Sequence, residues 1–169
     1  MELPKRKQIR LQDYDYAQPN AYFITICAHK RAHLFGTIVP SDVGATLRGR
    51  PHAPHKMIVK WLYELEKKYD GLLIDRFVIM PNHIHFIIFN TGRHIGRPLP
   101  EWIDWFKTQT TNEYIRCVKS GLYPPFDKRI WQRNYYEHVI RNEQDLTEIR
   151  QYIDENPLKW REDALYSPL

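Results

Sequence analysis

Two apolar runs separated by Pro-Asn constrain the fold of this chain most strongly. Residues 72–80 and 83–90, LLIDRFVIM and HIHFIIFN, are rich in β-branched and aromatic side chains, as strands are. Pro81 and Asn82 between them favour a tight turn. The sequence therefore predicts an antiparallel β-hairpin whose second strand is almost entirely apolar and buried.

The remaining elements follow from periodicity and from Gly, Pro and Asn breakers. Strands are expected at 21–28, 33–40 and 130–140, with 29–32 as a hairpin loop and 41–55 as an irregular connection. Helices are expected at 56–69, at 101–118 and from about Glu143 to Asn156, with Asn142 as the N-cap of the last one.

This order of elements predicts an α+β fold. A βαββαβ core gives the ferredoxin-like arrangement, an antiparallel sheet with helices on one face, and here a further C-terminal helix follows it. We find no internal repeat or linker in the 169 residues, so we expect a single domain over 1–169. Residues 1–20 are expected to form a basic N-terminal arm.

Composition narrows the class of protein. Hydrophobic residues make up 43% and charged residues 27%, as in globular proteins, and no apolar run is long enough for a transmembrane helix. The N-terminus lacks the apolar stretch of a secretory signal, and Cys27 and Cys117 match no zinc or redox spacing, which favours a cytoplasmic protein with reduced thiols. A net charge of +5 with 14% aromatic residues is compatible with nucleic-acid binding without requiring it.

The histidines of the second hairpin strand need an explanation. His83 and His85 are two residues apart, so they point to the same face of the strand, whereas Ile84, Phe86 and Ile88 point to the other face and can pack on helices. Two such imidazoles can ligate one divalent ion, although hydrogen-bonded structural histidines give the same pattern. An apolar strand that carries two polar rings favours a site.

A hydrophobic residue between two histidines on a strand is the HUH motif. The chain resembles the single-tyrosine HUH transposases, and more closely the REP-associated tyrosine transposases of bacteria. Residues 9–29, 78–88 and 131–160 carry the resemblance, including VIMPNHIHFII and WQRNYYEHVIRNEQDLTEIRQYIDENPLKW. Residues 41–56 are the least diagnostic part.

The resemblance implies a nucleophile and a metal site. Tyr152, in QYIDENP, matches the nucleophile of the family, and Asn156 matches the polar residue that supplies a third ligand beside His83 and His85. The implied cofactor is Mg²⁺ or Mn²⁺, for which a carboxamide oxygen is a suitable ligand. Tyr152 and Asn156 are four residues apart and share a helix face, while Leu146, Ile149 and Ile153 form its apolar stripe.

Other side chains compete for these roles. Tyr135 and Tyr136 are rival nucleophiles, and His138 either assists the site or makes a structural hydrogen bond. Asparagine before proline is also a common helix end, which is the alternative for Asn156. Trp102 and Trp105 either stack on bases or pack in the core.

The resemblance implies metal-dependent cleavage and rejoining of single-stranded or hairpin DNA, including REP-type sequences, through a 5′-phosphotyrosine. The partner is then DNA in the bacterial cytoplasm or nucleoid, without a membrane, and the protein is either a monomer or a helix-swapped dimer. The candidate DNA contacts are all cations, each of which could also be a solvated surface charge: Lys5, Arg6, Lys7, Arg10, Arg48, Arg50, Arg93 and Arg97.

Two other functions fit the same sequence. A basic, aromatic ferredoxin-like sheet could bind single-stranded nucleic acid or DNA hairpins without cutting, although the signature run of RRM domains is absent. A metal-dependent nuclease could use water in place of a tyrosine.

Overall fold

The computed structural model describes residues 18–41, 44–48, 53–92 and 99–168. Its main sheet has four antiparallel strands in the order β4-β5-β1-β6, and a separate hairpin pairs β2 with β3. The strands are β1 Asn20–Cys27, β2 Thr37–Ser41, β3 Gly44–Arg48, β4 Leu72–Ile79, β5 His83–Asn90 and β6 Tyr136–Ile140. The helices are α1 Pro54–Lys68, α2 Leu99–Lys119 and α3 Glu143–Glu155.

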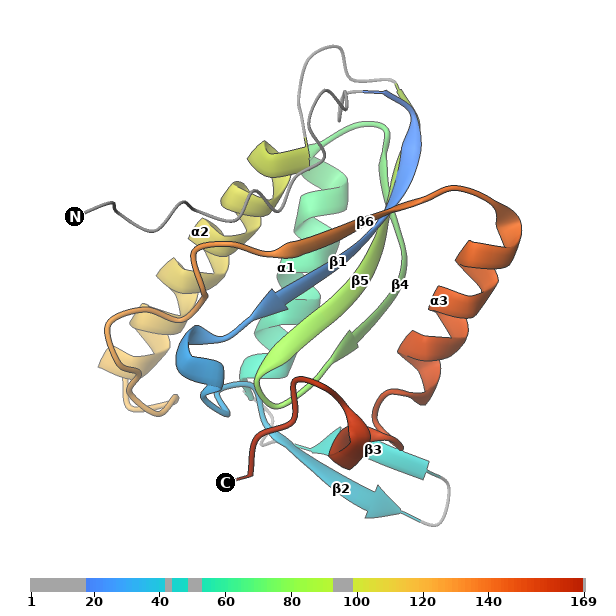
Figure 1. Cartoon of the computed structure of the whole chain (residues 1–169). Helices are drawn as coiled ribbons and strands as arrows, with labels where there is room; N and C mark the ends of the chain where they lie inside the picture. Colours follow the sequence, from blue (N-terminus) through green and yellow to red (C-terminus); the bar gives the residue numbers. More distant parts are fainter. Residues whose placement is uncertain (1–17, 42–43, 49–52, 93–98, 169) are drawn as a thin grey trace, which may run out of the picture.

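The predicted ferredoxin-like fold is confirmed. Without the β2–β3 hairpin, the elements follow the order βαββαβ, and α3 comes last along the chain. The first and third strands of this core, β1 and β5, lie in the middle of the sheet, and β4 and β6 form its edges. Helices α1 and α2 cover one face, while α3 lies on the other (Figure 1).

Burial of both sheet faces explains why β1 and β5 are apolar along most of their length. Tyr22, Ile24 and Ile26 of β1 belong to the larger core under α1 and α2, together with Ile84 and Phe86 of β5. The fully buried Trp102 and Phe106 of α2 pack in this same core, which favours the packing role of Trp102 over base stacking.

A smaller core lies between the sheet and α3. Phe23 and Ile87 contribute from the central strands, and Leu146 and Ile153 contribute from the apolar stripe expected for the helix. The helix begins at the expected N-cap, because the side-chain oxygen of Asn142 accepts a hydrogen bond from the Asp145 N–H at 2.9 Å.

An ion pair fixes α3 to the edge of the sheet. The Arg150 guanidinium donates two hydrogen bonds to the Asp75 carboxylate of β4, at 2.7 and 2.9 Å. Arg76 and Asp154 add a more distant pair at 3.9 Å. Because Tyr152 lies between Arg150 and Asp154, these contacts hold its part of the helix over the same chain's sheet.

The expectations for 29–55 were partly wrong. The strand expected at 33–40 does not pair with β1. The observed strand, β2, covers Thr37–Ser41 and pairs with β3, Gly44–Arg48, which lies inside the segment expected to be irregular. Both sides of β1 are already occupied by β5 and β6. A short 3-10 turn at His29–Arg31, with positive φ at Lys30 and Arg31, replaces the expected hairpin loop.

Other local predictions hold. The turn at Pro81-Asn82 is confirmed, because the Met80 N–H donates to the His83 carbonyl at 2.8 Å. Of the 130–140 segment expected to be a strand or extended, Tyr136–Ile140 pairs with β1, and Trp131 makes an isolated bridge to Ala28. Within the described parts of the chain, no helix has the length and apolar character needed to cross a membrane.

Candidate metal and tyrosine site

The two histidines lie on the α3 face of the sheet, as the strand alternation predicted. In the β1–β5 register, Thr25 is opposite His85 and Cys27 is opposite His83. The two imidazole centroids are 4.5 Å apart, and both side chains are buried. The paired β-strands therefore place the two rings side by side under α3.

Asn82 orients the first imidazole. Its Oδ1 lies 2.7 Å from His83 Nδ1, while its Nδ2 donates to the Leu165 carbonyl at 3.0 Å, an arrangement that assigns the ring proton to Nδ1. His83 Nε2 then carries a lone pair, and it is buried without a hydrogen-bond partner among the described residues. Burial, with the Trp160 ring 5.8 Å away, lowers the pKa of His83 to about 4, although nearby Asp163 opposes the shift.

Thr25 orients the second imidazole. Its hydroxyl lies 2.7 Å from His85 Nδ1, which leaves Nε2 facing α3. Phe23 stacks on the ring with centroids 5.3 Å apart. Burial, reinforced by His83, holds the pKa of His85 well below its usual value, so both imidazoles are neutral at pH 7 and able to act as ligands.

Tyr152 reaches this pair from α3. Its hydroxyl lies 3.3 Å from His85 Nε2 and donates to Asp163 Oδ2 at 3.4 Å. The side chain is 44% exposed, so the nucleophile candidate is open to a substrate. Partial burial and the Asp163 carboxylate raise the pKa of Tyr152 to about 12, so the phenol keeps its proton at neutral pH.

Asn156 and Asp163 complete the cluster. Asn156 follows the last turn of α3 and is buried, and its Nδ2 donates to Asp163 Oδ2 at 2.8 Å. Its Oδ1 is buried without a hydrogen-bond partner in the part of the chain that the structure describes. Asp163 Oδ2 is also 3.8 Å from His83 Nε2, and Oδ1 accepts from the Leu165 N–H at 2.6 Å.

These donors fit a divalent cation. One ligand atom each from His83, His85 and Asp163 lies within 4.8 Å of the others. Within this cluster two buried atoms lack a hydrogen-bond partner among the described residues, His83 Nε2 and Asn156 Oδ1, and both carry lone pairs, as metal ligands do. Imidazole nitrogen together with carboxylate and amide oxygen suits an ion of intermediate hardness such as Mn²⁺.

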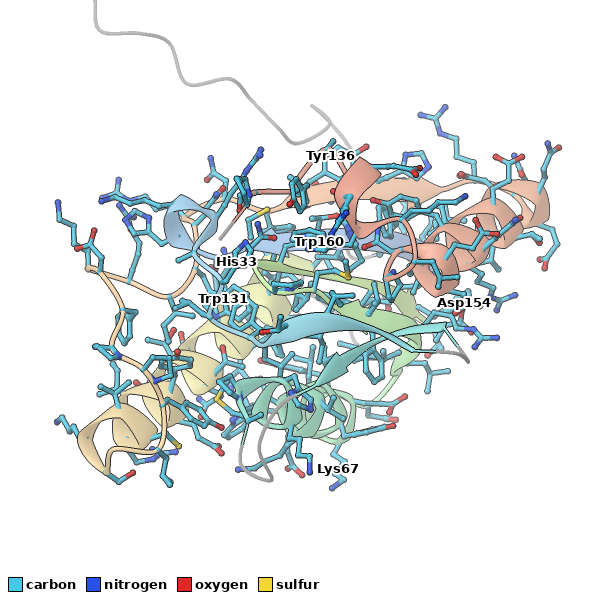
Figure 2. All side chains as sticks on the ribbon, turned by 90° about the horizontal axis from the view of Figure 1, so that it is seen from below. His33, Lys67, Trp131, Tyr136, Asp154 and Trp160 are labelled. Carbon is cyan, nitrogen blue, oxygen red and sulfur yellow. The ribbon has the colours of Figure 1, made fainter. Side chains whose placement is uncertain are left out.

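Asp163 was not found by sequence reasoning. It follows the short 3-10 turn Trp160–Glu162, in a segment with no periodic pattern, and it reaches the histidines only because the chain folds back under β5. Figure 2 shows Trp160 of this segment lying near His33, and their ring centroids are 6.0 Å apart. The local sequence gives no signal for such a long-range contact.

The other candidates lie in different places. His138 Nε2 is 2.9 Å from Asp145 Oδ2 at the start of α3, two turns of helix away from Tyr152, which favours the structural alternative. Tyr135 and Tyr136 line a pocket beside Tyr152 and His85, but the tyrosine hydroxyl within hydrogen-bond distance of His85 Nε2 is that of Tyr152. Arg48 ends β3; the remaining cations proposed for DNA contact lie outside the described residues: Lys5, Arg6, Lys7, Arg10, Arg50, Arg93 and Arg97.

The histidine burial predicts a dependence of stability on pH. A histidine with a folded-state pKa of about 4 and an unfolded pKa near 6.5 stabilises the metal-free fold above pH 6.5, and this contribution is lost as pH falls towards 4. We expect His83 alone to lower the unfolding free energy by about 2 kcal/mol between pH 7.5 and 5. Urea titrations in EDTA measure it, and a His83→Asn variant that keeps the full pH dependence would contradict this assignment.

Comparison with known proteins identifies the family. Residues 52–156, well over half of the chain, match the family described as IS200-like transposases. The chain belongs to this family. The matched segment includes His83, His85, Tyr152 and Asn156, whereas Asp163 lies beyond it.

Two Haemophilus influenzae proteins resemble this transposase family member. One, uncharacterised, is 35% identical over 95% of this chain and 93% of its own length. The other, provisionally named a REP-associated tyrosine transposase, is 32% identical over 48% of this chain and 47% of its own length.

Two solved structures share the fold. A REP-associated tyrosine transposase bound to a REP hairpin matches with a TM-score of 0.59 and 20% identity, over 89% of this chain and 73% of the other. A transposase assigned provisionally in Deinococcus radiodurans matches with a TM-score of 0.51 and 16% identity, over 86% of this chain and 95% of the other. At these identities the likeness concerns the fold.

Proposed function

We propose that this protein cleaves and rejoins single-stranded DNA at hairpin or REP-type sequences through a tyrosine-linked intermediate. The observation that carries the proposal is the position of the Tyr152 hydroxyl, 3.3 Å from His85 Nε2, at the edge of a buried cluster with metal-ligand character. Family membership and the hairpin-bound structural relative support the substrate class.

The reaction is a transesterification. The Tyr152 oxygen forms a bond to the phosphorus of a phosphodiester while the bond from phosphorus to the 3′-oxygen breaks, which gives a 5′-phosphotyrosine and a free 3′-hydroxyl. Because the ester bond is kept, a second 3′-hydroxyl can reverse the step and join strands. The number of phosphoester bonds is unchanged, so no nucleotide cofactor is needed.

Each residue of the cluster has a role in this reaction. His83, His85 and Asp163, with the Asn156 oxygen, would hold Mg²⁺ or Mn²⁺, which when bound polarises a non-bridging phosphate oxygen. The phenol must lose its proton during attack because its pKa is raised to about 12, and the carboxylate to which it donates, that of Asp163, is the proton acceptor within reach; His85 Nε2 is assigned to the cation. The bonds from Asn82 and Thr25 keep the imidazoles in orientation.

The direct test is covalent trapping. Protein incubated with Mn²⁺ and end-labelled hairpin DNA with single-stranded flanks is expected to give a band that survives denaturation, and EDTA should prevent it. Binding of the hairpin without any adduct would favour the non-cleaving DNA-binding function. Cut DNA without an adduct would favour the water-dependent nuclease.

The role of Asp163 makes a separate prediction. If its carboxylate binds the cation, Asp163→Asn and Asp163→Ala should both weaken Mn²⁺ binding by about 10-fold or more, because both remove the negative charge. The amide of the Asn variant can still accept the Asn156 hydrogen bond. Mn²⁺ titration followed by electron paramagnetic resonance measures the affinity.

The matched control for this experiment is Asp154→Asn, at an exposed position of α3 that is labelled in Figure 2. Asp154 pairs with Arg76. This change should leave Mn²⁺ affinity within two-fold of the wild type. If Asp163→Asn also binds Mn²⁺ like the wild type while Asp163→Ala does not, Asp163 only orients Asn156 and is not a ligand.

A further inference from the structure

Tyr152 lies between two pockets of opposite character. The first, of about 500 Å³, lies over β1 and the segment that leads into β6, and it reaches both His85 and Tyr152. The second, of about 410 Å³, lies along α3 and contains Asp163 and Asn156. Both volumes fall in the range of small-molecule sites, so volume alone does not say which one a DNA strand enters.

Charge distinguishes the two pockets. Among the described residues, four carboxylates and one lysine line the second pocket, from Glu148, Glu155, Glu162, Asp163 and Lys159. Away from the cation that Asp163 and Asn156 would hold, these carboxylates repel a DNA strand. Among the described residues, the lining of the first pocket contains no Asp, Glu, Lys or Arg. A neutral pocket suits an uncharged flat group better than a phosphate.

The lining of the first pocket suits a nucleobase. Tyr136 is 54% exposed, and it stands opposite Thr25 in the β1–β6 register, hence on the α3 face with His85 (Figure 2). Base stacking on such rings contributes about 5- to 150-fold to single-strand affinity. Gln132 and Asn134 also line the pocket. Because neither side-chain amide makes a hydrogen bond within the described residues, both amides are available to pair with the edge of a base.

The position of the first pocket beside Tyr152 determines which nucleobase of the DNA can enter it. In the proposed reaction the scissile phosphate lies at the Tyr152 hydroxyl, and Tyr152 lines the first pocket. The base attached to one side of that phosphate is therefore the group that can enter. We propose that this pocket binds the nucleobase next to the scissile phosphate, with Tyr136 stacking on it and Gln132 and Asn134 selecting its identity; this inference rests on the proposed function.

Binding tests the stacking without requiring cleavage. The probe is fluorescein-labelled hairpin DNA with randomised single-stranded flanks, titrated in EDTA and followed by anisotropy. Tyr136→Ala should raise the dissociation constant about five-fold or more. The control is Tyr63→Ala, because Tyr63 is 53% exposed but belongs to α1 on the opposite face of the sheet, and it should stay within two-fold. Equal effects of the two variants would overturn the pocket.

Sequencing tests the selection. Adducts formed with the same DNA pool in Mn²⁺ are recovered, and both the linked and the released strands are sequenced. The wild type should show a base preference at one of the two nucleotides that flank the cut. Gln132→Ala and Asn134→Ala should reduce this preference about five-fold or more. Gln151→Ala, in the acidic pocket, is the matched control and should leave it unchanged.

The outcomes separate the two claims. Absence of any adduct in the wild type contradicts the proposed function, and the anisotropy result then decides whether the pocket binds a base. An adduct whose flanking preference is the same in the wild type, Gln132→Ala and Asn134→Ala overturns base selection while the proposed function stands.

Discussion

The Tyr152→Phe variant is expected to form no covalent DNA adduct, a loss of at least about 1,000-fold, because it lacks the hydroxyl oxygen that we propose as the nucleophile. The fold should persist. The ring keeps its contacts with Phe23 and His85, and the two lost hydrogen bonds, at 3.3 and 3.4 Å, are long. Hairpin DNA binding in EDTA should also persist. Denaturing gels of labelled DNA measure the adduct.

Tyr135→Phe and Tyr136→Phe are the matched controls, since both tyrosines line the pocket beside Tyr152. Each control should retain the adduct at no less than about one fifth of the wild-type level, because each keeps its ring. An adduct that survives in Tyr152→Phe and disappears in one of the controls would assign the nucleophile to that other tyrosine.

Changing either histidine of the pair to asparagine is expected to weaken Mn²⁺ binding more than about 100-fold and to remove the adduct. Asparagine places a polar group near the position of Nδ1, so it can keep the bond to Asn82 or Thr25, but it lacks the atom at Nε2. Mn²⁺ titration of His83→Asn and His85→Asn measures the loss, and circular dichroism at each pH checks the fold.

His138→Asn provides the control for these two variants. His138 is bonded to Asp145 at the start of α3, so its loss should lower stability by about 1 kcal/mol without changing Mn²⁺ affinity. If His138→Asn weakens Mn²⁺ binding as much as His83→Asn does, the metal site lies elsewhere than at the histidine pair.

Local patterns were sufficient to predict the central part of the molecule. The apolar alternation of 83–90, with two histidines on one face, placed His83 and His85 opposite Ile84 and Phe86, and the structure confirms it. The helical stripe of Leu146, Ile149 and Ile153 likewise determines which side of α3 faces the sheet. The position of Tyr152 near His85 follows from these two patterns together. The chemical roles of these side chains stay predictions.

Contacts between distant segments could not be predicted in the same way. Asp163 reaches the site because the segment after α3 folds back towards the start of β5. A hydrogen bond from Asn82 Nδ2 to the Leu165 carbonyl, between residues 83 positions apart in the sequence, holds this segment in place. The pairing of β2 with β3 depends on β5 and β6 occupying both sides of β1, which is a property of the whole sheet. The sequence predicts Asn82 as a turn residue, but it carries no signal for the hydrogen bond from Asn82 to His83.

Diffraction at the manganese absorption edge, from crystals grown with Mn²⁺, tests the central claim most directly. The claim is that His83, His85, Asp163 and Tyr152 converge around one cation. We predict one anomalous peak bound by the Nε2 atoms of both histidines and by Asp163, with the Tyr152 hydroxyl facing the ion. A peak away from the histidine pair, or a Tyr152 ring turned out of the site while the ion is bound, would contradict the account.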